Sequence, residues 1–211
     1  MPYKPGEREY RVFSVPLQCR EAEAVEGETE VKEESYIVEG YATTFNDPYV
    51  MFTYDGVDYS EQIDRDALVD ADMSDVLFLY NHEGMVYARI SNGTLEVSTN
   101  ERGLYVKADL GRTEQSRQMY EQIKEGLVTQ MSWAFTIAPD GDSYDEDSHV
   151  RTINRVAKVY DVSAVAYPAN PNTDISARAY FDGVIEAEAQ RRRDRERVEE
   201  LRKAIMAKIG G

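Results

Sequence analysis

The strongest constraint on the fold is a strand-like segment, residues 128–137, in which large and small side chains alternate. Side chains of a β-strand point alternately to opposite faces, so this pattern predicts one bulky apolar face and one face of small residues. The bulky face comprises Met131, Trp133, Phe135 and Ile137, and the small face comprises Ser132, Ala134 and Thr136. The segment therefore predicts a strand that anchors a core on one side and presents a serine hydroxyl on the other.

Further strand-like segments, rich in β-branched and aromatic residues, recur along the chain. They are residues 9–17, 36–45, 76–82, the hairpin 94–110 and the return strands of 150–170. The clearest helix is 112–127, because Met119, Tyr120, Ile123 and Leu127 share one face and Gly126 lies near its end. This alternation of many strands with few helices predicts an α+β fold that is mostly β.

The remaining segments are predicted as loops and one short helix. Residues 46–60 are interpreted as a loop, and residues 60–73 as a short acidic helix with Ser60 as its N-cap. Residues 139–149 form an acidic turn. We divide the chain into an N-terminal strand and acidic loop (1–36), a central domain (37–182) and a charged helical tail (183–211) with an apolar stripe at helical spacing.

Bulk composition excludes several classes of protein. The 211 residues are 42% hydrophobic, enough for a packed core, and carry a formal net charge of −16. A nucleic-acid-binding protein needs a basic face to displace counterions from phosphate, so this class is disfavoured. The one cysteine, Cys19, allows no intrachain disulfide. No apolar stretch approaches the ~20 residues of a membrane span, and the N-terminus lacks a signal-peptide core, so we expect a soluble intracellular protein.

Ser132 and His82 are the candidate nucleophile and general base. A serine hydroxyl is a poor nucleophile at neutral pH unless a neighbouring base takes its proton, and imidazole suits that pH range. His82 follows an apolar strand, so we expect it to be firmly placed, whereas the other histidine, His149, lies among acidic residues of a turn and is interpreted as solvated. The plainer alternatives are a serine on an ordinary half-exposed strand and a structural histidine.

Asp161 is the candidate third member, which would orient the imidazole and stabilise its protonated form. It lies in a largely apolar strand, where a carboxylate is costly without a partner. A structural ion pair explains it equally well. Other chemistries fit less well: there is no HExxH motif, paired Cys/His cluster or Gly-rich phosphate loop, so we expect no metal and no cofactor.

Five blocks in order take the interpretation further. EGYATTFN, LYNHEG, a Gly-Leu hairpin strand, EGLVTQMSWAF and VYDVSAVAYPANP, from Glu39 to Pro171, resemble the tailed-phage prohead protease family. The resemblance implies a serine protease with a fold like the herpesvirus assemblin, a mostly β barrel-like body flanked by helices. It assigns the family's histidine to His82 and its serine to Ser132, and it makes Ser163 a decoy. The family's third residue is commonly glutamate, whereas this chain has Asp161.

The resemblance also implies a biological role. Such enzymes act inside the procapsid, in the host bacterial cytoplasm, and cut the scaffold or the scaffolding region of the major capsid protein, often also themselves. A homodimer is expected from the assemblin likeness, and Arg89 is our prediction for an oxyanion donor. The alternatives are a non-enzymatic assembly or scaffold factor derived from such a protease, and an esterase that uses the same residue pair.

Overall fold

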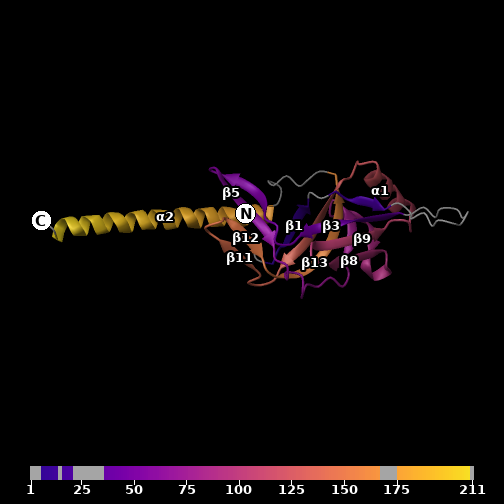
Figure 1. Ribbon diagram of the computed structural model, residues 1–211, viewed down its shortest axis with the longest axis horizontal. Helices are drawn as coiled ribbons and strands as arrows, with labels where there is room; N and C mark the ends of the chain where they lie inside the picture. The colour runs from indigo at the N-terminus through magenta and orange to yellow at the C-terminus, as the bar shows by residue number, and fades with distance from the viewer. Residues whose placement is uncertain (1–5, 14–15, 21–35, 167–174, 210–211) are drawn as a thin grey trace, which may run out of the picture. The chain divides into compact units, whose positions relative to one another are not determined.

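The computed structural model describes residues 6–13, 16–20, 36–166 and 175–209 (Figure 1). The chain divides into two compact units, one of residues 5–174 and one that contains the C-terminal helix. Most of the acidic segment 20–36 lies outside the described residues, so its predicted loop has no structural counterpart here. The candidate residues Ser132, His82 and Asp161 all lie in the first unit.

One sheet has five strands in the order β1-β10-β13-β6-β7. These strands are β1 (Arg8–Phe13), β10 (Gln130–Ile137), β13 (Val156–Val165), β6 (Leu77–Tyr80) and β7 (Glu83–Arg89). β10 pairs antiparallel with β1 and β13, and β13 pairs parallel with β6. Segments that are far apart in the sequence therefore lie on adjacent strands, which is what brings the candidate residues together.

Two further sheets complete this unit. One contains β2 (Gln18–Arg20), β3 (Ile37–Thr44), β9 (Gly103–Asp109) and β8 (Leu95–Thr99), and the other β11 (Asp142–Asp145), β12 (Val150–Ile153), β5 (Val57–Ile63) and β4 (Tyr49–Tyr54). A short 3-10 helix, Ile90–Asn92, links β7 to β8. The predicted α+β class, mostly β, agrees with this arrangement. The described strands form three sheets and no closed barrel, unlike the predicted barrel-like body.

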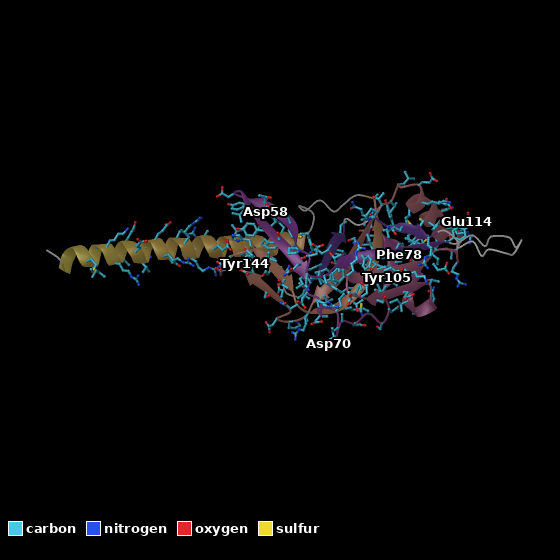
Figure 2. The ribbon with its side chains drawn as sticks, viewed as in Figure 1. Asp58, Asp70, Phe78, Tyr105, Glu114 and Tyr144 are labelled. Carbon is cyan, nitrogen blue, oxygen red and sulfur yellow. The ribbon has the colours of Figure 1, made fainter. Side chains whose placement is uncertain are left out.

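The core forms on the bulky face of β10, as its alternation predicted. Met131, Trp133 and Phe135 are fully buried, and the Trp133 and Phe135 rings stack with centroids 4.0 Å apart. Phe78 of β6, labelled in Figure 2, is buried in the same core. The small face of β10 is also buried from Ser132 to Thr136, so this strand is covered on both sides. Strands covered on both faces are typical of the centre of a sheet.

Both α-helices were predicted, with different limits. α1 (Glu114–Lys124) begins after Thr113, whose hydroxyl accepts the Ser116 N–H at 3.1 Å as an N-cap. Leu127, predicted on its buried face, is 68% exposed because the helix ends before Gly126, which has a positive φ of 72°. α2 (Ile175–Ile209) begins before residue 183. Among the described residues, no helix combines the length and apolar character that crossing a membrane requires.

Two predictions for residues 46–73 are wrong. The predicted loop is a hairpin of β4 and β5, joined by Asp55 and Gly56, which both have positive φ (51° and 78°). An Asp-Gly pair with positive φ at both positions is the two-residue turn that best matches the twist of paired strands. The predicted helix is absent, because Ser60 belongs to β5 and the following residues form turns with hydrogen bonds such as Ala67 N–H to Asp64 O.

Candidate active site

The pairing of β10 with β13 places a serine and a carboxylate on one face of the sheet. Ser132 lies opposite Ser163, and Ala134 lies opposite Asp161. Residues directly opposite in paired strands share a face, and so do residues two apart along one strand. The hydroxyl of Ser132, the hydroxyl of Ser163 and the carboxylate of Asp161 therefore all lie on the face opposite the Trp133 core.

A two-residue turn delivers the imidazole to this face. β6 ends at Tyr80, which pairs with Glu83 of β7, so Asn81 and His82 are the two central residues of the hairpin. Both have positive φ, 51° and 63°, the signature of a type I′ turn. The second of these positions usually carries glycine. Here it carries His82, whose side chain can therefore turn back over β13.

The three candidate side chains form one hydrogen-bonded chain. His82 Nδ1 lies 2.6 Å from Asp161 Oδ1, and His82 Nε2 lies 2.6 Å from Ser132 Oγ. The Asp161 side chain is 2% exposed and the His82 side chain 15% exposed. In this arrangement Nδ1 carries the ring hydrogen and donates it to the carboxylate. The Nε2 lone pair is then directed at the serine hydroxyl.

Ser132 has a second acceptor within reach. Its Oγ lies 2.9 Å from the backbone carbonyl oxygen of Arg11 on β1, which can only accept a hydrogen bond. A serine hydroxyl has a single hydrogen. When the neutral ring carries its hydrogen on Nδ1, this hydrogen is shared between two acceptors, His82 Nε2 and Arg11 O. When the ring is protonated, Nε2 donates to Oγ and the hydroxyl donates to Arg11 O, so every group in the chain is satisfied.

Arg11 itself belongs to a buried ionic cluster under the opposite face of β1. Its guanidinium donates to Glu61 Oε2 at 2.7 Å and pairs with Glu9, and Arg151 donates to both carboxylates at 3.2–3.3 Å. We name Glu9, Arg11, Glu61 and Arg151 the buried ionic cluster; all four are at most 4% exposed. The two guanidinium groups are matched by these two carboxylates, as burial of charge requires, and Arg151 Nε also donates to the partly buried Asp142 at 2.8 Å.

The pKa of Glu61 shows that the cluster favours ionised side chains. Burial raises this pKa, but the positive charges of Arg11 and Arg151, with hydrogen bonds from Arg11 and Tyr49, outweigh burial and hold it below 4.5. For Arg151, burial lowers the pKa, but the negative charges of Glu61 and Glu9 outweigh burial and raise the pKa above its usual value. The cluster thus ties β1, which supplies the carbonyl beside Ser132, to β5 and β12 through ion pairs.

The site is closed in this structure. Ser132 has no exposed surface, and the ring of Tyr10 on β1 packs edge-on against the ring of His82 with centroids 4.7 Å apart. Tyr10 is 40% exposed, so part of this side chain faces solvent next to the imidazole, whose own side chain is 15% exposed. A substrate carbonyl can reach Ser132 Oγ only after a covering group moves.

Two other residues from the sequence analysis lie apart from this chain of hydrogen bonds. Arg89 lies on β7 opposite Leu77 of β6, and Leu77 in turn lies opposite Asp161 of β13, so Arg89 is two strands away from Asp161. Its guanidinium donates to Asp75 through both Nε and Nη2. His149 was interpreted as solvated. It is instead half-buried, with its Nδ1 2.9 Å from the Tyr144 hydroxyl and its ring packed near Tyr59.

The structure adds Tyr10 and Arg11 to the surroundings of the site, and it places Ser163, named above as a decoy, against Asp161. The spacing of Ser163, two positions after Asp161 on a strand, predicts that the two residues share a face. Tyr10 and Arg11 carry no such signal, since only the pairing of β1 with β10 brings them to Ser132. Among the described residues, no group of three or more His, Cys, Asp or Glu side chains is arranged to hold a metal ion.

A serine hydroxyl bonded to an imidazole, which is bonded in turn to a buried carboxylate, is the arrangement of serine hydrolases. The chain belongs to the caudovirus prohead serine protease family, whose family model matches residues 22–184. The matched range contains His82, Ser132 and Asp161, whereas β1 precedes it. No curated protein and no solved structure matches the chain. Family membership points to a serine protease of phage capsid maturation, and a phage prohead protease acts inside the procapsid.

Proposed function

We propose that this chain is a serine endopeptidase that cleaves the scaffold, or the scaffolding region of the major capsid protein, during procapsid maturation, and that it also cleaves itself. The observation that carries the proposal is the hydrogen-bonded chain from Ser132 through His82 to Asp161, within the region matched by the family. We propose that the protease acts in the procapsid within the host cytoplasm, as a homodimer and without a cofactor.

The proposed mechanism is acyl transfer through a serine ester. Ser132 Oγ attacks the scissile carbonyl carbon while His82 Nε2 takes the hydroxyl proton. The peptide C–N bond then breaks, and the same proton passes to the leaving amine. Water then attacks the ester carbonyl carbon while His82 Nε2 takes its proton, and the bond to Ser132 Oγ breaks as His82 passes that proton to Oγ. Throughout, Asp161 accepts the Nδ1 hydrogen and stabilises the imidazolium that forms.

Co-expression with the major capsid protein encoded beside this chain tests the proposal. We expect intact-protein mass spectrometry to show a shortened capsid or scaffold protein with the wild type and the full-length protein with Ser132→Ala. The loss should be at least about 10³-fold, since removal of a nucleophile leaves only binding and electrostatic contributions. Equal shortening with both chains would contradict the assignment of Ser132.

A second candidate is favoured by the burial of the nucleophile. Because Ser132 has no exposed surface, the chain could serve as a non-enzymatic assembly factor derived from a protease. A serine-directed fluorophosphonate separates the two functions: a protease incorporates the phosphonyl group at Ser132, whereas an assembly factor stays unlabelled yet co-assembles with the capsid protein. Small ester substrates tested beside the capsid protein distinguish an esterase.

The oxyanion donor is a separate part of the proposal. Arg89 stays a prediction for this role, although its guanidinium is paired with Asp75 on a partly exposed surface in this structure. Arg89→Ala tests it, because removal of a true oxyanion donor lowers kcat by about 10²–10³-fold. Asp75→Ala is the matched control, since it breaks the same ion pair and leaves the guanidinium in place.

A further inference from the structure

Ser163 lies beside the Ser132–His82–Asp161 chain and contacts two parts of it. Its Oγ lies 2.8 Å from Asp161 Oδ1 and 3.1 Å from the backbone nitrogen of His82. The side chain is fully buried on β13, directly opposite Ser132. Buried hydroxyl groups are kept where they are hydrogen-bonded, and this one is bonded only to members of the candidate site in the contacts that the structure gives.

The direction of both hydrogen bonds is fixed by chemistry. A backbone N–H can only donate, so Ser163 Oγ accepts from His82. An ionised carboxylate can only accept, so the single hydroxyl hydrogen of Ser163 points to Asp161. His82 is therefore connected to the same carboxylate oxygen twice, directly from Nδ1 and through Ser163 from its backbone N–H. This closed ring of hydrogen bonds restrains His82 at two places, its backbone N–H and its ring Nδ1.

The backbone of His82 requires such a restraint. Its φ of 63° lies in the left-handed region, which is strained for residues other than glycine and persists when surrounding contacts hold it. Two contacts from β13 hold this turn: the Asn81 N–H donates to Ala164 O at 3.1 Å, and the His82 N–H donates to Ser163 Oγ. Without the hydroxyl, the His82 N–H would lose its acceptor and Asp161 would lose one of its donors.

We propose that Ser163 is a positioning residue of the protease site, whose hydroxyl holds the backbone and the ring tautomer of His82 for proton transfer with Ser132. The proposal rests on the proposed function, because it assigns His82 as the general base. It also revises the role of Ser163, which the sequence alone presented as a decoy. Because Ser163 acts through His82, its loss should slow the chemical step and leave binding unchanged.

The test compares the full chain with Ser163→Ala by fluorophosphonate labelling and by NMR. We expect the maximal labelling rate to fall about 10- to 100-fold, as for other residues that orient a reacting group, with the half-saturating probe concentration unchanged. The chain has only two histidines, so ¹⁵N-histidine labelling with His149→Gln assigns the His82 ring. We expect the wild type to show the Nδ1–H tautomer and Ser163→Ala to show averaged nitrogen shifts.

Two variants separate positioning from packing. Ser163→Thr keeps the hydroxyl and should recover most of the labelling rate and the Nδ1–H tautomer. Ser116→Ala is the matched control, because it deletes another buried hydroxyl, bonded to Tyr87 O at 2.8 Å, away from the site. If Ser163→Ala does not fold, Ser163→Cys replaces it, since a thiol has similar size and donates weakly, and the expected direction is the same.

The outcomes distinguish this proposal from the proposed function. Wild-type rate and wild-type tautomer in Ser163→Ala would overturn the positioning role, even if Ser132 is reactive. A rate loss shared equally by Ser116→Ala would also overturn it, because the effect would then be general destabilisation. If the wild type does not label but its His82 tautomer depends on Ser163, the positioning role stands and the protease function fails.

Discussion

At the scale of single residues, the site is built around a conformation that most side chains avoid. Asn81 and His82 both have positive φ, and Asn is one of the few residues other than glycine that adopts this region readily. An Asn-Gly pair would form the same turn with less strain. The presence of His82 at the glycine position therefore costs stability and places the candidate general base beside Ser132 and Asp161.

The exposed Asn81 gives a direct measure of this strain. We expect Asn81→Ala to lower the free energy of unfolding by about 1 kcal/mol, because alanine in the left-handed region costs roughly 1–2 kcal/mol. Asn81→Gly should leave stability within about 0.5 kcal/mol. Urea unfolding of the three chains makes the measurement. Equal losses for alanine and glycine would mean that the Asn81 side chain, rather than its backbone conformation, matters.

The sequence alone suggested three of the residues in the hydrogen-bonded chain, for identifiable reasons. Ser132 stood out because it is a hydroxyl on the small-residue face of a cleanly alternating strand, and His82 because it ends an apolar strand. The neighbours on β1 could not be found in this way. Tyr10 and Arg11 lie more than a hundred residues before Ser132; the contact of Ser132 with the Arg11 carbonyl oxygen joins residues 121 positions apart. Such proximity depends on strand pairing, which periodicity does not determine.

At the scale of strands, the alternation of side chains predicted a strand correctly where clear turn residues bound the segment at both ends. The segments of β3, β8, β9 and β10 show this alternation and are bounded by polar or glycine-containing turns, and all four were predicted. The β4–β5 hairpin was missed because residues 46–60, which contain Asp55-Gly56, were predicted as a loop, although Asp-Gly is a strong hairpin signal. The false helix at 60–73 followed from that error, since its first residues complete β5.

The buried ionic cluster makes the packing of β1 sensitive to acid. The pKa of Glu61 is lower in the folded protein than its usual 4.5, so the ionised form stabilises the fold above pH 4.5. This contribution is lost as the pH falls below 4.5 through the lower folded-state pKa. We therefore expect the unfolding temperature of the wild type to drop in acid, with β1 and the Arg11 carbonyl among the first contacts affected.

Glu61→Gln tests the acid response. At pH 7 we expect a loss of about 3–5 kcal/mol in the free energy of unfolding, because Arg11 and Arg151 keep their charges with one carboxylate fewer. Below pH 4.5 the difference in the free energy of unfolding between the variant and the wild type should become smaller. Glu96→Gln, an exposed carboxylate on β8, is the control and should follow the wild type throughout. A difference in the free energy of unfolding that is the same at all pH values would show that Glu61 stabilises the fold by packing and not by charge.

At the scale of the whole molecule, the two compact units differ in character. The first buries the candidate site within its sheets, whereas the C-terminal helix α2 leaves large apolar side chains in solvent. Val198, Leu201 and Ile205 are 49–55% exposed and follow one another at helical spacing, and Met206 is 71% exposed. Apolar stripes of this kind on a charged helix are typical of surfaces that bind another helix.

This stripe gives the expected homodimer a testable location. We expect light scattering to give the full chain about twice its 24.1 kDa mass, and to give the monomer mass for the double variant Leu201→Glu, Ile205→Glu. Like charges brought into an apolar helix contact would each remain unpaired and desolvated, which disfavours association. Lys203→Ser is the control, because residue 203 lies on the other side of α2 and pairs with Glu199. A double variant that stays dimeric would place the dimer contact elsewhere, and a wild type that is already monomeric would contradict the homodimer prediction.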